Sequence, residues 1–124
     1  MTLKSLLRGK TAEQQAVKYL KNHGLKVLEK NKRYPCGELD IVAADKNTHL
    51  FVEVKYRSNA EFGGANEMIS ASKQAKLVKA AKLWLQENDP QFEKACRFDV
   101  IAIDNSQNER SLTWVKNAFT PELW

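Results

Sequence analysis

The sequence predicts a single α/β domain of about five strands and two helices, and three patterns carry this prediction. Residues 37–57 hold two runs in which apolar and polar side chains alternate, as in the strands of a β-hairpin. Apolar residues recur at helical spacing in residues 11–23 and again from about residue 70 or 72 to residue 87. Short apolar runs at residues 97–103 and 111–116 add two strands. No repeat or linker divides the 124 residues, so we expect one core.

The first helix is predicted from Thr11 to His23. Thr11 is suited to cap its N-terminus, and Gly24 is suited to end it. Glu13 precedes Val17 by about one turn, so it lies at the edge of the apolar stripe rather than opposite it. An acid at that edge can reach below the protein surface.

A first strand is predicted over residues 25–34, and its second half is basic through Lys30, Lys32 and Arg33. Pro35 ends this strand because a proline cannot donate a hydrogen bond to a neighbouring strand. The hairpin begins directly afterwards.

The hairpin brings acidic side chains together. A two-residue turn at Lys46–Asn47, with Asn accepting a positive φ, sets Asp40 opposite Glu53 and Glu38 opposite Lys55. Directly opposed side chains have Cβ atoms roughly 5 Å apart. Two carboxylates at that distance repel each other unless a cation or a proton lies between them, which suggests a metal site.

Residues 58–70 contain a Gly-Gly pair and show little periodicity, so we expect a mobile loop that closes over substrate. The helix that follows is predicted from about Ser70 or Ser72 to Glu87. Lys73 and Gln74 lie in its first turn, where the helix dipole favours anions such as phosphate.

Composition favours a polyanionic partner, because 20 Lys and Arg residues exceed 15 Asp and Glu residues by 5. Cys36 and Cys96 have no zinc-site spacing, and neither a signal sequence nor a membrane span is recognisable, so a soluble cytoplasmic protein is expected. His23 and His49 are expected in solvent, and Asp99 is not expected to be a ligand.

The spacing of Asp40, twelve further residues and then Glu53-Val54-Lys55 resembles the PD-(D/E)xK nuclease signature, although residue 39 is Leu rather than Pro. A wider set of motifs resembles the bacterial YraN-like family over roughly residues 8–104: TAEQQAVKYLKNHG, GELDIVA, FVEVKYR, the GGA of the loop, KQAKLVKAAKLWL and RFDVIAI. That family is similar to restriction endonucleases and Holliday-junction resolvases. The resemblance implies a restriction-endonuclease-like α/β fold with a mixed central sheet flanked by helices. It also implies one nuclease-like domain, 1–124, with a core at about 8–116 and a tail at 117–124.

The resemblance also implies roles for individual residues. Asp40 and Glu53 match the metal-binding acids, and Lys55 matches the motif lysine. Glu13 matches an acid that resolvase-like members carry on the first helix, and Glu38 belongs to the family's own pattern. Further candidates are the metal-binding carbonyl of Val54 and a helix glutamine matched by Gln74. Oxygen donors of this kind suit Mg²⁺ or Mn²⁺.

Two functions follow from these patterns. The first is a metal-dependent nuclease that acts on DNA, including branched or structured DNA; RNA as the substrate and a homodimer are left open. The second is a nucleic-acid-binding module that keeps the fold but performs no chemistry. Either would contact phosphates through the candidate nucleic-acid-binding residues Lys30, Lys32, Arg33, Arg57, Lys73 and Gln74.

Overall fold

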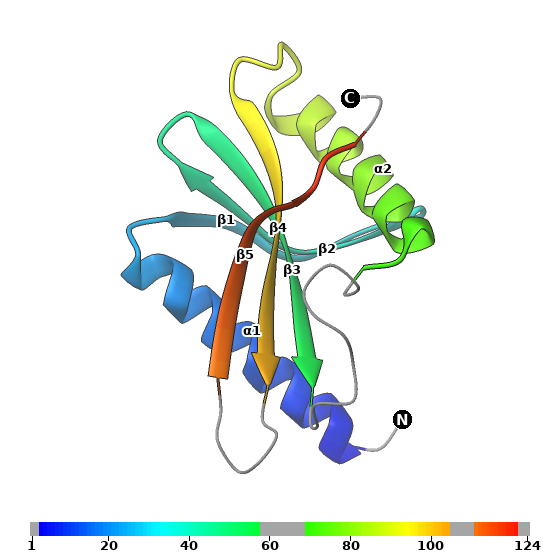
Figure 1. The fold of residues 1–124 in the computed structure, drawn as a ribbon. Coiled ribbons are helices and arrows are strands. Elements are labelled where there is room, and N and C mark those ends of the chain that lie inside the picture. Colours follow the sequence, from blue (N-terminus) through cyan, green and yellow to red (C-terminus); the bar gives the residue numbers. More distant parts are fainter. Residues whose placement is uncertain (1–2, 58–68, 105–110, 122–124) are drawn as a thin grey trace.

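The computed structural model describes residues 3–57, 69–104 and 111–121 of the 124-residue chain, with side chains from Thr11 onward except that of Arg57. The described residues form one five-stranded sheet, in the order β1-β2-β3-β4-β5, and two helices (Figure 1). Only the β3–β4 pairing is parallel within this sheet, so the predicted α/β fold with a mixed sheet is confirmed. The elements are α1 (Leu3–Asn22), β1 (Lys26–Tyr34), β2 (Gly37–Asp45), β3 (Thr48–Arg57), α2 (Ala71–Asn88), β4 (Ala95–Asp104) and β5 (Ser111–Phe119).

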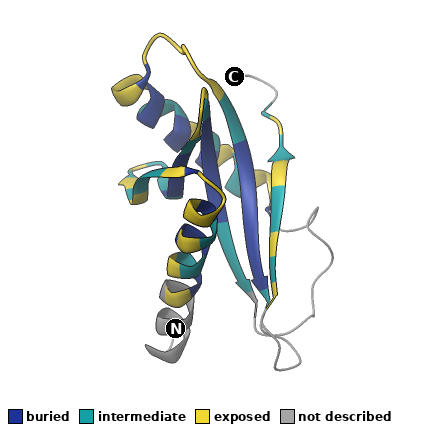
Figure 2. Ribbon diagram, turned by 90° about the vertical axis from the view of Figure 1, so that its left-hand side faces the viewer, coloured by how far each residue is buried: buried dark blue, intermediate teal, exposed yellow. Residues whose placement is uncertain are grey.

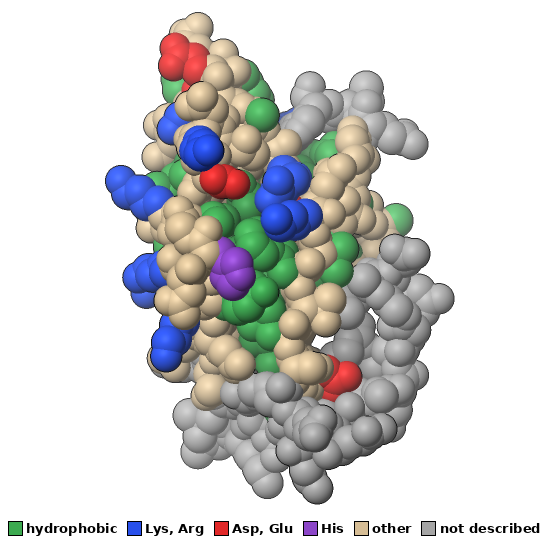
Figure 3. Space-filling view, turned by 60° about the vertical axis from the view of Figure 1, so that its left-hand side comes forward, with side chains coloured by type: hydrophobic (Ala, Val, Ile, Leu, Met, Phe, Trp, Pro, Cys, Tyr) green, Lys and Arg blue, Asp and Glu red, His purple; other side chains and the backbone are tan. Residues whose placement is uncertain are grey.

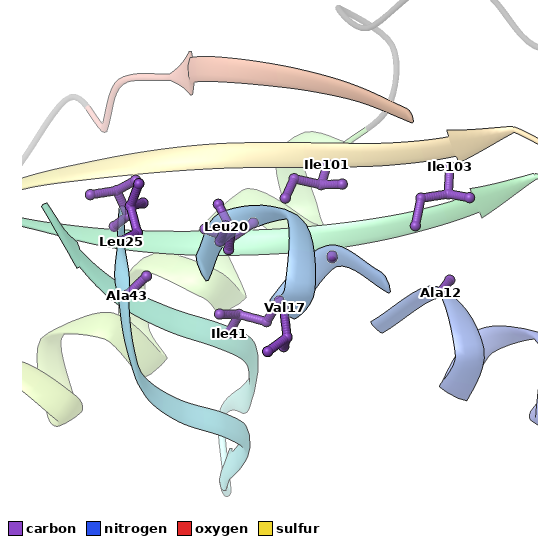
Figure 4. Close-up of a cluster of buried hydrophobic side chains, with 11 residues drawn as sticks. Ala12, Val17, Leu20, Leu25, Ile41, Ala43, Ile101 and Ile103 are labelled. Carbon is purple, nitrogen blue, oxygen red and sulfur yellow. The ribbon is translucent and has the colours of Figure 1, made fainter. Parts of the chain in front are cut away.

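Each helix packs on its own face of the sheet. The apolar stripe of α1 includes Ala12, Val17 and Leu20, and it meets Ile41 and Ile101 in one core cluster (Figure 4). The second cluster joins α2 to the opposite face, with buried residues Leu39, Val42, Phe51, Ile69, Leu77, Ala80, Ala81, Trp84, Leu85, Phe98 and Val100. Because successive strand residues face opposite sides, the central strands are buried along much of their length (Figure 2).

The β2–β3 hairpin has the predicted two-residue turn and register, but its pairing is short. It runs from Asp45↔Thr48 to Ile41↔Val52, after which β1 and β2 turn away from β3 (Figure 1). The expected Glu38–Lys55 pair is therefore wrong; Glu38 lies opposite Arg33 of β1 instead.

The alternation of β2 also breaks near this point. Leu39 was expected to share a face with Ile41 and Ala43, yet it packs on the α2 side with Val42. In the turn, the left-handed residue is Lys46, with φ 53°, rather than Asn47.

The predicted start of the first helix differs from the structure, and that of the second agrees with it. Helix α1 begins at Leu3, so the prediction of Thr11 as its first cap is wrong. Residues 3–10 contain mostly good helix formers and no proline, which allows the helix to continue through Thr11. Helix α2 begins at Ala71, within the predicted range of Ser70 to Ser72, and the Oγ of its cap Ser70 accepts a hydrogen bond from the Lys73 backbone N–H at 3.1 Å.

His49 was expected in solvent, and this expectation is wrong because its side chain is buried. Its ring lies edge-on to the Trp84 ring, with centroids 5.1 Å apart, and its Nε2 lies 3.5 Å from Asp89 Oδ2. Burial, helped by the charge of Lys94, lowers the pKa of His49 more than the nearby Asp89 carboxylate raises it. The C-terminal end of α2 thus covers this part of the hairpin. His23 is exposed, as expected.

Strand β5 extends to Phe119, past the predicted end at residue 116. The Phe119 ring stacks on the Phe98 ring with centroids 4.7 Å apart, so part of the predicted tail belongs to the sheet. The predicted loop at 58–68 and the turn at 105–110 lie outside the described residues. Neither α1 nor α2, where the structure describes them, is long and apolar enough to cross a membrane.

Candidate functional site

Asp40 lies where β2 separates from β3, and its carboxylate replaces a strand-to-strand hydrogen bond. In this register Ile41 and Val52 exchange backbone bonds, so the next backbone donor of β3 is Val54. The Val54 N–H donates to Asp40 Oδ2 at 3.0 Å. The separation of the strands therefore holds the Asp40 carboxylate in a fixed place beside β3.

Glu53 carries the most perturbed carboxyl group of the site. Only 6% of the residue is exposed, and within the described residues its Oε2 has no hydrogen-bond partner. Its Oε1 lies 3.5 Å from the Nζ atom of Lys73, in the first turn of α2. Burial, followed by the negative charge of Asp40, raises the pKa of Glu53 to about 8, which outweighs the opposite effects of Lys73 and Lys55. Without a bound cation, Glu53 holds a proton near neutral pH and shares a hydrogen bond with Asp40.

Glu13 approaches the same acids from α1. It lines a cavity of about 290 Å³ together with Gln14, Val17, Lys30, Asn31, Asp40 and Ile41. Burial and the charge of Asp40 raise the pKa of Glu13, whereas a hydrogen bond to Asn31 lowers it. The charge of Glu38 adds a smaller upward effect on this pKa. Asp40 therefore lies between two acids: it shares the cavity with Glu13 and acts electrostatically on Glu53, while Glu38 is within electrostatic reach of Glu13.

Asn31 is a site residue that the sequence patterns did not indicate. It lies inside β1 with φ 51°, a left-handed conformation that costs most L-residues roughly 1–2 kcal/mol. Its side chain reaches the cavity and hydrogen-bonds to Glu13. The available signal was an asparagine between lysines, because asparagine adopts this conformation more readily than most residues.

The predicted cationic residues take different positions. The Nζ atom of Lys73, expected to contact phosphate, lies 3.5 Å from Glu53 Oε1, and the charge of half-buried Lys55 also acts on Glu53. Lys30 lines the acidic cavity. Arg33 Nε lies 3.8 Å from a Glu38 oxygen, with an exposed side chain.

The remaining candidates lie apart from the acids or outside the description. The Nζ atom of Lys32 lies 5.6 Å from the centre of the Tyr34 ring. Gln74 donates to the Ile69 carbonyl at 3.1 Å and lines a different groove, between α2 and residues 119–121. The side chain of Arg57, the last residue of β3, is outside the described part of the chain.

Comparisons with known proteins identify the family. The model of the "Uncharacterised protein family UPF0102" matches residues 12–103, which include Glu13, Asp40 and Glu53. The chain belongs to this family. A UPF0102 protein of Francisella tularensis is 49% identical over 112 residues, covering 90% of this chain and 92% of the relative. A UPF0102 protein of Pseudomonas putida is 48% identical over 112 residues, covering 90% of this chain and 91% of the relative. One of Stutzerimonas stutzeri is 44% identical over 111 residues, covering 90% of this chain and 92% of the relative. The YraN-like resemblance is thereby confirmed.

The donor atoms of this UPF0102 site fit a divalent cation. Within the described residues, no three His, Cys, Asp or Glu side chains gather closely enough to hold a metal by themselves. The candidate set is instead the carboxylates of Asp40 and Glu53 with the carbonyl of Val54, all of them the hard oxygen donors that Mg²⁺ and Mn²⁺ prefer. A cation would provide a partner for the buried Glu53 Oε2 and relieve the repulsion between the two acids.

Proposed function

We propose that this UPF0102 protein is a divalent-metal-dependent nuclease that hydrolyses phosphodiester bonds in DNA. The observation that carries the proposal is the Glu53 carboxyl group, buried beside Asp40 with one oxygen unpartnered among the described residues. Burying two adjacent acids destabilises a fold unless they bind a cation or a proton. The presence of both acids at the point where β2 separates from β3 supports a cation-binding function.

Mg²⁺ or Mn²⁺ held by Asp40, Glu53 and the Val54 carbonyl would supply Lewis-acid stabilisation of phosphate charge and a more acidic bound water. The ammonium groups of Lys55 and Lys73 act on Glu53 from β3 and α2, and the same charges can stabilise a phosphate in the transition state.

Glu13 is the candidate general base. Its raised pKa makes it a better proton acceptor from an attacking water than an ordinary surface glutamate, and it lies on the wall of the cavity that Asp40 also lines. Asn31 would hold the Glu13 carboxylate in position through their hydrogen bond.

The choice of substrate rests on charge and on family resemblance. The net charge of +5 and the basic second half of β1 favour a polyanion. Branched DNA is proposed because the family is similar to Holliday-junction resolvases.

The test is calorimetric titration of manganese into the wild type and the Asp40→Asn variant, with cleavage of four-way-junction, duplex and single-stranded DNA in the same buffer. We expect the wild type to bind manganese and cleave, and Asp40→Asn to lose both properties while remaining folded. Asp45→Asn is the matched control, because Asp45 is an exposed aspartate at the other end of β2. DNA binding without manganese binding or cleavage in the wild type would contradict the nuclease and favour the non-catalytic binding module.

A further inference from the structure

A cluster of aromatic rings lies on the other flank of α1, where the proposed hydrolysis does not use it. The rings of Tyr19 and His23 have centroids 4.2 Å apart, and the Trp114 ring of β5 stands nearly perpendicular to both, at 6.1 and 5.9 Å. We call Tyr19, His23 and Trp114 the aromatic corner. His23 is exposed, and the other two rings are partly exposed.

Basic side chains border this corner. The Nζ atom of exposed Lys116 lies 4.5 Å from the centre of the Trp114 ring, so a flexible side chain, rather than backbone, covers that face of the indole. Lys18, Lys21 and Lys26 are exposed at the end of α1 and the start of β1. Figure 3 shows a hydrophobic strip and a histidine with Lys and Arg side chains on either side, and acidic side chains near the two ends of the strip. An apolar surface with a cationic border matches the bases and phosphates of a nucleic-acid strand.

A buried carboxylate fixes the indole in place. Asp99, 1% exposed, accepts hydrogen bonds from Trp114 Nε1 and from the Asn117 backbone N–H, both at 2.9 Å. Arg97 donates two more to the same carboxylate, at 2.8 and 2.9 Å. Burying a charged group is unfavourable unless it is fully hydrogen-bonded, and here those bonds orient a partly exposed ring. The indole is therefore preorganised before any ligand arrives.

We propose that the aromatic corner is a binding site for an unpaired nucleobase, which stacks on Trp114 while the strand phosphates contact the surrounding lysines. The inference rests on the proposed function, because it gives the nuclease a single-stranded segment of its substrate to hold. Trp114 pairs with Ile101, and Ile101 with Val54, so Trp114 lies two strands from Val54 in the sheet. Helix α1 packs over the buried Ile101 between them, so a strand that reaches both sites would pass around α1.

Charge favours this occupant over a second copy of the chain. A symmetric dimer through this surface would bring its lysines toward those of the partner, and a chain with net charge +5 repels its own copy.

The experiment measures anisotropy of a labelled oligothymidylate, in a buffer with chelator so that no hydrolysis occurs. Trp114→Leu and Trp114→Phe both remove the indole N–H from Asp99, so their structural losses are matched and only the aromatic face differs. We expect Trp114→Leu to weaken binding about tenfold or more and Trp114→Phe to weaken it much less. His23→Ala, an exposed change, should give a smaller loss than Trp114→Leu. Trp84→Phe, in the α2 core, should leave affinity unchanged.

An abasic oligomer with the same number of phosphates separates stacking from charge, and its affinity should be equal for wild type and Trp114→Leu. Equal affinity of Trp114→Leu and wild type for oligothymidylate would overturn the inference, as would equal weakening toward the abasic oligomer. Loss of a wild-type dimer in Trp114→Leu, with unchanged DNA affinity, would make this surface an interface between copies and also overturn it. Trp114-dependent binding by a wild type that never cleaves would leave the base site standing and contradict the nuclease alone.

Discussion

The ionised form of the Glu53 side chain is less stable in the folded protein than in the unfolded chain. Its pKa is raised from 4.5 to about 8, so the folded protein keeps a proton there that the unfolded chain releases. The contribution to stability is fully present below about pH 4.5 and is lost as pH rises toward 8, by at most about 1.4 kcal/mol per pH unit.

We therefore expect Glu53→Gln to increase the free energy of unfolding of the metal-free protein near pH 8 and to flatten its fall between about pH 5 and pH 8. Urea unfolding at several pH values in chelator measures this. Glu93→Gln, an exposed acid, is the control and should follow the wild type. An unchanged slope in Glu53→Gln would mean that the buried carboxyl does not retain its proton.

Asn31 combines a backbone requirement and a side-chain requirement, and two substitutions separate them. Asn31→Ala should lower the free energy of unfolding by about 1 kcal/mol because alanine is strained at φ 51°, whereas Asn31→Gly should not. Both remove the hydrogen bond to Glu13, so DNA cleavage should fall in both. Chemical denaturation and initial cleavage rates provide the two readouts. Full activity of Asn31→Gly would show that the carboxamide does not position Glu13.

The sequence was sufficient to predict which side chains lie close together across a short turn. Asp40 and Glu53 could be placed together because a two-residue turn fixes the register of its hairpin. The contact between Lys73 and Glu53 could not be predicted, since it depends on how α2 packs across the sheet. The burial of His49 depends on the same packing. The position of the Asn31 side chain depends on the left-handed backbone conformation of Asn31 itself. An alternating strand pattern does not indicate such a conformation.

At the scale of elements, β5 is attached to the sheet through one buried carboxylate as well as through its backbone. Asp99→Asn keeps the side-chain shape but removes the buried carboxylate that pairs with the Arg97 guanidinium at 2.8 Å. We expect a loss of about 3 kcal/mol in the free energy of unfolding, the lower end for breaking a buried ion pair, because Arg97 is partly exposed. Urea denaturation measures the loss, with the surface variant Glu93→Gln as control. A loss no larger than that of the control would mean that the network does not hold β5.

The predicted elements were correct in type and less accurate at their ends. The start of α2 was predicted to within two residues, at about Ser70 or Ser72, and the Ser70 cap lies at the first of these. The start of α1 was missed because Thr11 resembles a cap but lies inside a longer helix. Strand β5 continues to Phe119 because Phe98 offers it a stacking partner on β4, a contact distant in sequence.

At the scale of the whole molecule, the basic face of β1 predicts how DNA binding depends on salt. The affinity should fall as salt rises, with a logarithmic slope of about 0.9 per phosphate contact. Alanine at Lys30, Lys32 and Arg33 together should reduce that slope by about 2 to 3. The control removes the same charge from α2, as alanine at Lys76, Lys79 and Lys82, and should change the slope less. Equal slopes for the wild type and the β1 variant, measured by anisotropy, would exclude β1 from the interface.

The parallel pairing of β3 with β4 has a consequence for the order of folding. Strands β1, β2 and β3 are joined by short turns within residues 26–57, so their contacts can form early, even while a ribosome is still synthesising the rest. Strand β4 can join β3 only after the intervening residues close a long loop, from Thr48↔Ala95 to Arg57↔Asp104. Asp40 and Glu53 would thus meet while still hydrated, and the unfavourable burial of Glu53 would fall on the later, slower step.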